Sequence, residues 1–127
     1  YVLILFLSAP YKTLGLHKSL LYFVGGILSI NFVHMYFALI DVTTLSPFYE
    51  HFFSVGPREE ICKFLAFLGI TKIFSKEKLH PVATMFSMGI VGLGFAMFEN
   101  LYYASHFGEG ILWGRAVTAT IGHLTFL

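Results

Sequence analysis

The residues of this chain that could do chemistry are ionisable groups placed inside otherwise apolar stretches. They are Glu59, Glu60, Lys63, Glu99, Arg115 and His123. A charge at the centre of a membrane helix costs roughly 2.5 to 3.5 kcal/mol on insertion scales, so four unpaired charges would forfeit about 10 kcal/mol. Because that is comparable with the stability of a whole fold, we expect these groups to be paired, hydrated or needed for function.

Two of the acidic residues, Glu59 and Glu60, are adjacent in the sequence. Paired carboxylates in a poorly hydrated site cannot both ionise cheaply, so one of them should hold a proton that it can exchange with a reacting group. Peptide hydrolysis without a nucleophilic side chain needs a base for water and a donor for the oxyanion. We therefore expect Glu59 to activate water while Glu60 shares or orients the proton. The candidate oxyanion donors are His123, Asn100 and Arg115.

Purely structural roles are the alternative for the same residues. Pro57 suits the first position of a helix, early carboxylates suit its positive end, and Glu59 can pair with Lys63 four residues further on. For Glu99 and Arg115 the structural alternative is an ion pair between helices. A lone membrane histidine often makes only a hydrogen bond between helices.

Apolar segments long enough for membrane helices must position these groups. A helix needs about 20 apolar residues to cross the bilayer core, and residues 19–40 and 81–105 meet that requirement. Residues 57–73 and 110–127 are shorter candidate spans that carry charges, and residues 1–7 are the stub of another helix. Because unpaired backbone groups in lipid cost several kcal/mol, we predict an all-α, polytopic transmembrane helical bundle of about four spans plus an N-terminal stub.

The composition fits a protein embedded in a lipid bilayer. Hydrophobic residues make up 57% of the 127 residues and charged residues only 12%, which is outside the usual range of soluble domains. The formal net charge of +1 provides no basic surface for nucleic acid. We expect residues 1–127 to form a single transmembrane helical domain. Both ends lie inside apolar runs, so we expect the chain to be a fragment of a longer protein.

Small residues recur at a spacing of four in the last two predicted helices. One series is Gly110, Gly114, Thr118 and Gly122, and the other is Gly92 with Ala96. Such stripes allow membrane helices to approach backbone to backbone. We therefore predict that the helices of residues 81–105 and 110–127 pack closely along these glycines.

The helical rise predicts the depth of each charged group. Counted at about 1.5 Å per residue from the outer face, Glu60 lies roughly 5 Å down, Arg115 about 7 Å and Glu99 roughly 9 Å. His123, counted in the same way, lies about 10 Å below the carboxylates. We therefore predict one shared layer for the acidic groups and Arg115, with His123 placed less well.

Three sequence blocks, taken in order, resemble the signature of the PrsW family of intramembrane proteases, which is related to the CAAX prenyl endopeptidase and bacteriocin-processing superfamily. The blocks are Glu59-Glu60-x-x-Lys63, Gly92-x-Gly94-Phe95-x-x-x-Glu99-Asn100, and Arg115 followed by His123. The resemblance implies a glutamic endopeptidase. By this resemblance the catalytic residues are Glu59, Glu60, Glu99 and His123, and the supporting residues are Lys63, Asn100 and Arg115.

The same resemblance implies the substrate class and the location. We expect cleavage of a membrane-anchored protein substrate of the anti-sigma-factor kind, in a bacterial or archaeal cell membrane, without a cofactor or bound metal. A zinc site is one alternative, but it needs tightly converging ligands, and the sequence has neither a His-Glu-x-x-His helix nor a cysteine set. The other alternative is a noncatalytic membrane scaffold, or a proton- or ion-coupled transporter with a buried Glu/Arg/His network.

Overall fold

The computed structural model describes residues 14–39, 55–74 and 80–125. Helices account for nearly all of them: α2 (Leu16–Leu39), α4 (Gly56–Phe74), α5 (Pro81–Phe107) and α6 (Gly110–Thr125). Within these three ranges there is no strand, so the all-α prediction is confirmed for this part of the chain. The predicted stub at residues 1–7 lies outside the described residues.

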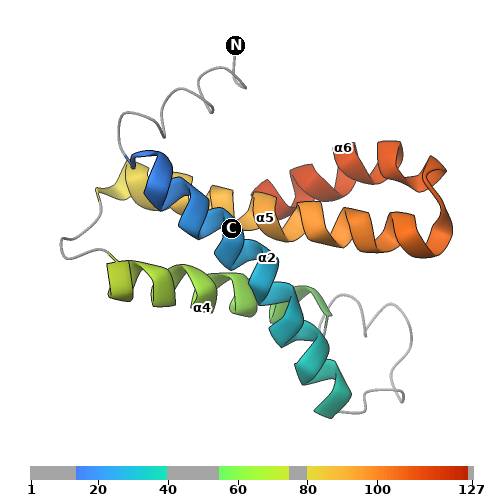
Figure 1. Ribbon diagram of the computed structural model, residues 1–127, viewed down its shortest axis with the longest axis horizontal. Helices are drawn as coiled ribbons and strands as arrows, with labels where there is room; N and C mark the ends of the chain where they lie inside the picture. The colour runs from blue at the N-terminus through green and yellow to red at the C-terminus, as the bar shows by residue number, and fades with distance from the viewer. Residues whose placement is uncertain (1–13, 40–54, 75–79, 126–127) are drawn as a thin grey trace.

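The central helix of the bundle is α5. It packs against α2, α4 and α6, and α2 also packs against α4. Three of the helices, α4, α5 and α6, follow the long axis of the molecule, and α2 crosses them obliquely (Figure 1). The backbones of α4 and α6 do not approach each other closely, so only side chains can join these two helices.

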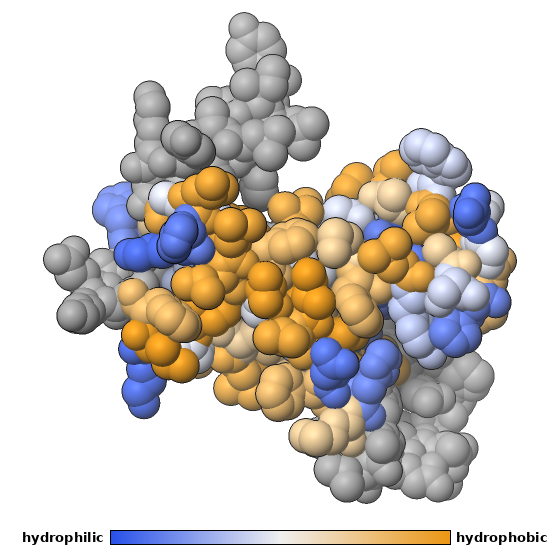
Figure 2. Space-filling model, in the orientation of Figure 1, coloured by the Kyte–Doolittle hydropathy of each residue, from blue (hydrophilic) through white to orange (hydrophobic). Residues whose placement is uncertain are grey.

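Two of the described helices are long and apolar enough to cross a membrane. They are α2, over Leu16–Met35, and α5, over its full length. The α4 helix carries five charged residues and α6 has only 16 residues. The prediction of about four spans is therefore not confirmed for the part of the chain described. Apolar residues cover much of the face in Figure 2, and hydrophilic residues gather mainly toward its ends.

Local sequence signals set both ends of α5. Its first turn contains Pro81, and His80 caps it by accepting a hydrogen bond from the Val82 amide at 3.4 Å. Gly108 ends the helix with a φ of +87°, which favours glycine, and its N–H donates to the Ala104 carbonyl at 2.9 Å. The short turn reverses the chain, so α6 runs back along α5 and brings its C-terminal half toward the middle of the bundle (Figure 1).

Two glycines allow the backbones of α2 and α5 to touch. A Cβ atom added to Gly26 would overlap the backbone carbonyl of Val91, and one added to Gly94 would overlap that of Phe23. Two backbones can approach this closely only where a residue has no side chain. A side chain at either glycine would force the two helices apart. This crossing is therefore a fixed part of the bundle, and Gly94 lies one turn before the polar part of α5.

The glycines of α6 do not serve the contact that their spacing predicted. A Cβ added to Gly110, Gly114 or Gly122 would meet no described atom within 4 Å. The α6 helix does pack against α5, but the predicted backbone contact along these glycines is wrong. The spacing identifies a stripe of small residues but not the neighbour that the stripe faces.

Candidate active site

The six ionisable residues singled out in the sequence lie together between α4, α5 and α6. We call them the charged cluster: Glu59, Glu60 and Lys63 from α4, Glu99 from α5, and Arg115 and His123 from α6. A continuous chain of polar contacts runs from Glu60 through Lys63, His123 and Glu99 to Arg115. The cluster therefore joins α4 to α6, the two helices whose backbones stay apart.

Glu99 is the acid with the most partners in the cluster. Its Oε2 atom lies 2.8 Å from the Arg115 guanidinium and 2.9 Å from Nε2 of His123. The same guanidinium lies over the ring of Tyr103, 3.7 Å from its centroid, a position in which an aromatic face attracts a cation. Arg115 thus lies where the sequence predicted a countercharge, and Tyr103 is an additional partner that sequence reasoning missed.

His123 lies closer to the carboxylates than the helical rise predicted. The depth count left it about 10 Å below them, whereas its ring contacts Glu99 directly, at 2.9 Å. The count assumed that every helix starts at one level and ignored the reach of the side chains. Both assumptions are wrong for α5 and α6, which differ in length and are joined by a short turn.

Lys63 is completely buried, with a side chain that is 0% exposed. Its Nζ atom lies 2.5 Å from Oε1 of Glu60 and 2.8 Å from Nδ1 of His123. The sequence alternative, in which Lys63 pairs with Glu59 four residues earlier, is not what forms, because Glu60 takes the lysine instead. Lys63 is therefore a link between α4 and α6.

Two further residues, for which we predicted no role, support the site. Phe95 is 1% exposed and lies beneath both Lys63, 4.4 Å from its ring centroid, and His123, whose ring packs edge-on at 5.1 Å. Thr120 accepts a hydrogen bond from Nδ2 of Asn100 at 3.3 Å, which ties α5 to α6. Helical spacing was the available signal, since Phe95 precedes Glu99 by one turn and Thr120 precedes His123 by three residues.

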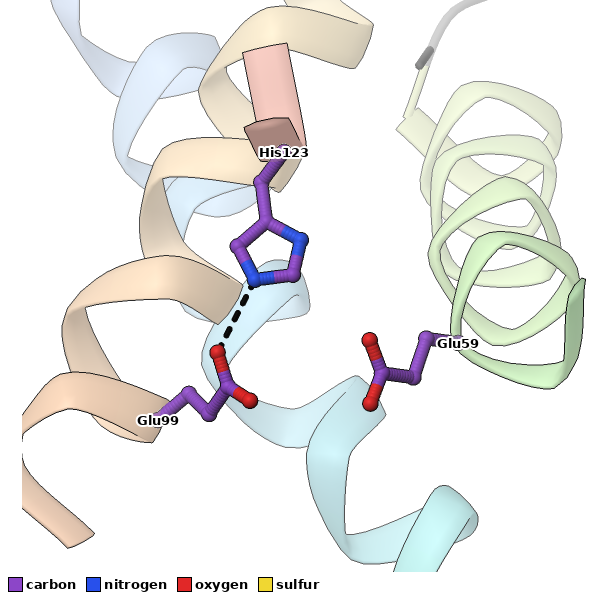
Figure 3. A group of neighbouring side chains, drawn as sticks. All are labelled: Glu59, Glu99 and His123. Carbon is purple, nitrogen blue, oxygen red and sulfur yellow. Dashed lines mark hydrogen bonds and ion pairs between the residues drawn. The ribbon is translucent and has the colours of Figure 1, made fainter. Parts of the chain in front are cut away.

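Glu59 differs from the other acids of the cluster because its carboxylate has no close partner. Figure 3 shows it extending from α4 toward Glu99 and His123. Atoms of these three residues lie within 4.8 Å of one another, but no described residue makes a hydrogen bond or ion pair with Glu59. Its side chain is half-buried. Glu59 thus offers an unpaired carboxylate to the space beside the paired residues.

The grouping of Glu59, Glu99 and His123 meets the convergence that a metal site requires, which the sequence could not show. Two of the three residues, however, already contact cations. His123 receives the Lys63 ammonium at Nδ1, and Glu99 holds the Arg115 guanidinium. A divalent ion would have to compete with these two cations for His123 and Glu99. His123 would have to give up one of its two hydrogen bonds to bind a metal ion, because both of its ring nitrogens are in use.

Comparison with known proteins identifies the family. A family model described as "PrsW family intramembrane metalloprotease" matches residues 15–126. No curated protein and no solved structure gives a significant match. The matched range contains all the described helices and every residue of the charged cluster. The chain therefore belongs to the PrsW family of intramembrane proteases.

Proposed function

We propose that this protein hydrolyses a peptide bond of membrane-anchored protein substrates and that Glu59 is the base that activates water. The observation that carries the proposal is the unpaired Glu59 carboxylate, held beside a histidine and a second carboxylate that already have polar partners. Family membership supports the protease activity, and the arrangement of the charged cluster supports the choice of base.

The contacts of the three acids favour Glu59 over the other two. A general base needs an oxygen lone pair that can take a proton from water. Glu99 shares its Oε2 between Arg115 and His123, and Glu60 is held by Lys63. Removing a proton from water at either of those carboxylates would compete with a charge-assisted contact. Glu59 faces no such competition from the described residues.

The reaction follows from this assignment. Glu59 takes one proton from a water molecule while the water oxygen attacks the carbonyl carbon of the substrate. The oxyanion that forms is stabilised by His123 or Arg115, which already hold an anionic oxygen of Glu99. Glu59 then gives its proton to the amide nitrogen as the carbon–nitrogen bond breaks. The products are a new carboxyl terminus and a new amine.

The space between α4 and α6 is the approach that we assign to the substrate. These helices are joined by the Lys63–His123 contact and not by close backbone packing. A peptide segment can reach Glu59 there without displacing the glycine contact of α2 and α5. This position suits a substrate anchored in the same membrane. By family resemblance we place the protein in a bacterial or archaeal cell membrane, with substrates of the anti-sigma-factor kind.

The proposal is tested by reconstituting the purified protein in liposomes with single-span model substrates and identifying the products by mass spectrometry. Glu59→Gln keeps the shape of the side chain but cannot accept a proton from water. We expect turnover to fall by about 10² to 10⁴-fold, the usual contribution of a general base, with helix content unchanged. Glu109→Gln, in the exposed turn between α5 and α6, is the matched control and should retain full activity.

Two results would contradict the proposal. If Glu59→Gln cleaved as fast as the parent, another group would be the base. If the parent cleaved nothing but moved protons across the liposome membrane in a Glu59-dependent manner, the cluster would belong to a transporter.

A further inference from the structure

We propose that Lys63 is a positioning residue that determines which ring nitrogen of His123 carries the proton. In this arrangement Nδ1 of His123 is unprotonated and Nε2 is protonated, so the histidine acts as a fixed donor. The consequence for catalysis rests on the proposed function, whereas the proton placement itself does not. The evidence comes from the contacts on the two sides of the imidazole ring.

The contact with Lys63 defines the Nδ1 side of the ring. A lysine ammonium has three donors and no acceptor, and Nζ lies 2.8 Å from Nδ1. The hydrogen bond can form only if Nδ1 accepts, which requires that this nitrogen has no proton. Glu60 accepts a hydrogen bond from the same ammonium, with its Oε1 atom 2.5 Å from Nζ.

The contact with Glu99 defines the opposite side. Its carboxylate accepts hydrogen bonds, and Arg115 bound to the same oxygen favours the ionised form. Nε2 of His123 lies 2.9 Å from that oxygen, so Nε2 must donate. Both contacts therefore select the same neutral tautomer. A doubly protonated ring would direct an N–H at the Lys63 ammonium.

The burial of Lys63 keeps water away from the Nδ1 side of the ring. The side chain is 0% exposed and its Nζ atom lies over the face of Phe95. Water cannot replace the ammonium without opening the contact between α4 and α5. The imidazole of His123 packs against the same phenylalanine, so both partners of the hydrogen bond contact one aromatic ring.

The catalytic consequence is a division of roles. A histidine held with an unprotonated Nδ1 that already accepts from Lys63 is not available as a base for water. Its Nε2–H points at the anionic oxygen of Glu99 and can donate only to an anionic oxygen placed there, so Glu59 is left to take the proton from water. Substituting Lys63 should therefore lower kcat, because Nδ1 is then free to take a proton and the ring is no longer held in its neutral form, and leave KM nearly unchanged, because Lys63 is too deeply buried to touch the substrate.

The test is nitrogen-15 NMR of histidine-labelled protein in bilayers, with His123→Gln identifying the two ring signals by their loss. The parent should show one protonated nitrogen at Nε2 and one unprotonated, hydrogen-bonded nitrogen at Nδ1. Lys63→Met removes the ammonium at similar length, and Nδ1 should then become protonated. Lys63→Arg keeps a cationic donor and should preserve the parent signals. Lys72→Met, at an exposed lysine of the same helix, is the control.

The outcomes are decisive in each case. A proton on Nδ1 of the parent would overturn the proposal even if Lys63→Met failed to fold. Unchanged His123 signals in a folded Lys63→Met protein would overturn it as well. In the liposome assay we expect kcat of Lys63→Met to fall about 10- to 100-fold, the usual effect of losing a residue that orients a functional histidine. If the parent cleaves nothing, the proposed function fails while the NMR result still stands.

Discussion

Two helix pairs of this bundle are held together in opposite ways. The α2 and α5 helices touch through their backbones at Gly26 and Gly94. The α4 and α6 helices keep their backbones apart and meet through the Lys63–His123 contact. The first pair leaves no space for a third partner, and the second is bridged by groups that can bind one. The charged cluster therefore joins two helices whose backbones do not touch, away from the closest backbone contact of the bundle.

The contact between α2 and α5 helps to position the residues that join α4 to α6. Gly94 lies directly before Phe95, the ring that carries both Lys63 and His123. The α5 helix takes part in the glycine contact with α2 and also carries Phe95 and Glu99 of the site. Its contact with α2 therefore fixes the helix from which Glu99 extends. Precise sites are usually built on elements that cannot move.

The largest effect is expected at the glycine crossing. Gly94→Leu would place a side chain where the backbone of Phe23 lies, so α2 and α5 would have to separate. We expect the free energy of unfolding to fall by about 3 kcal/mol or more, measured by circular dichroism during denaturation in mixed micelles. A variant as stable as the parent would show that the two helices do not touch at this glycine.

The charged cluster should be less sensitive than the crossing. Arg115→Met leaves Glu99 with His123 as its one remaining partner in the cluster, and we expect a loss of about 2 kcal/mol because the pair is only partly buried. Adding Glu99→Gln should recover part of this loss, since the uncompensated charge is then removed. Strictly additive losses in this double-mutant cycle would mean that the two residues do not interact.

The smallest effect is expected on the exposed stripe of α6. Gly114→Ala adds a methyl group that meets no described atom within 4 Å, and alanine favours helix more than glycine does. Stability should change by no more than about 0.5 to 1 kcal/mol, in the stabilising direction, and cleavage should be unaffected. A strong loss of stability or of cleavage would show that the glycines of α6 form a packing interface. The close backbone contact would then not be confined to α2 and α5.

The sequence predicted the helices well but not their partners. Apolar length predicted a helix over residues 81–105, and α5 runs from Pro81 to Phe107. Hydrophobic pattern alone does not say which glycines face a neighbour. The spacing predicted a close contact along the stripe from Gly110 to Gly122 and along Gly92 and Ala96, whereas the structure has close backbone contacts at Gly26 and Gly94. Contacts between helices depend on rotation and crossing angle, which a single sequence does not encode in an obvious pattern.

The members of the charged cluster could be named from the sequence, because charges are rare in apolar helices and therefore conspicuous. The contacts among these residues could not be predicted from the sequence. Whether Lys63 would pair with Glu59 or Glu60 depends on side-chain direction, and the reach of His123 to Glu99 depends on how α6 lies against α5. The supporting role of Phe95 was hidden for the same reason, since an aromatic residue in a membrane helix is ordinary.

The central claim is that Glu59, in a cluster that also holds the cations Lys63 and Arg115, activates water without a metal ion. It is tested most directly by measuring the metal content and the cleavage rate of one purified, chelator-treated sample. We predict substoichiometric zinc and an undiminished rate. Stoichiometric metal in the untreated protein, with activity lost on chelation and restored by zinc, would contradict the claim and make Glu59, Glu99 and His123 the metal ligands.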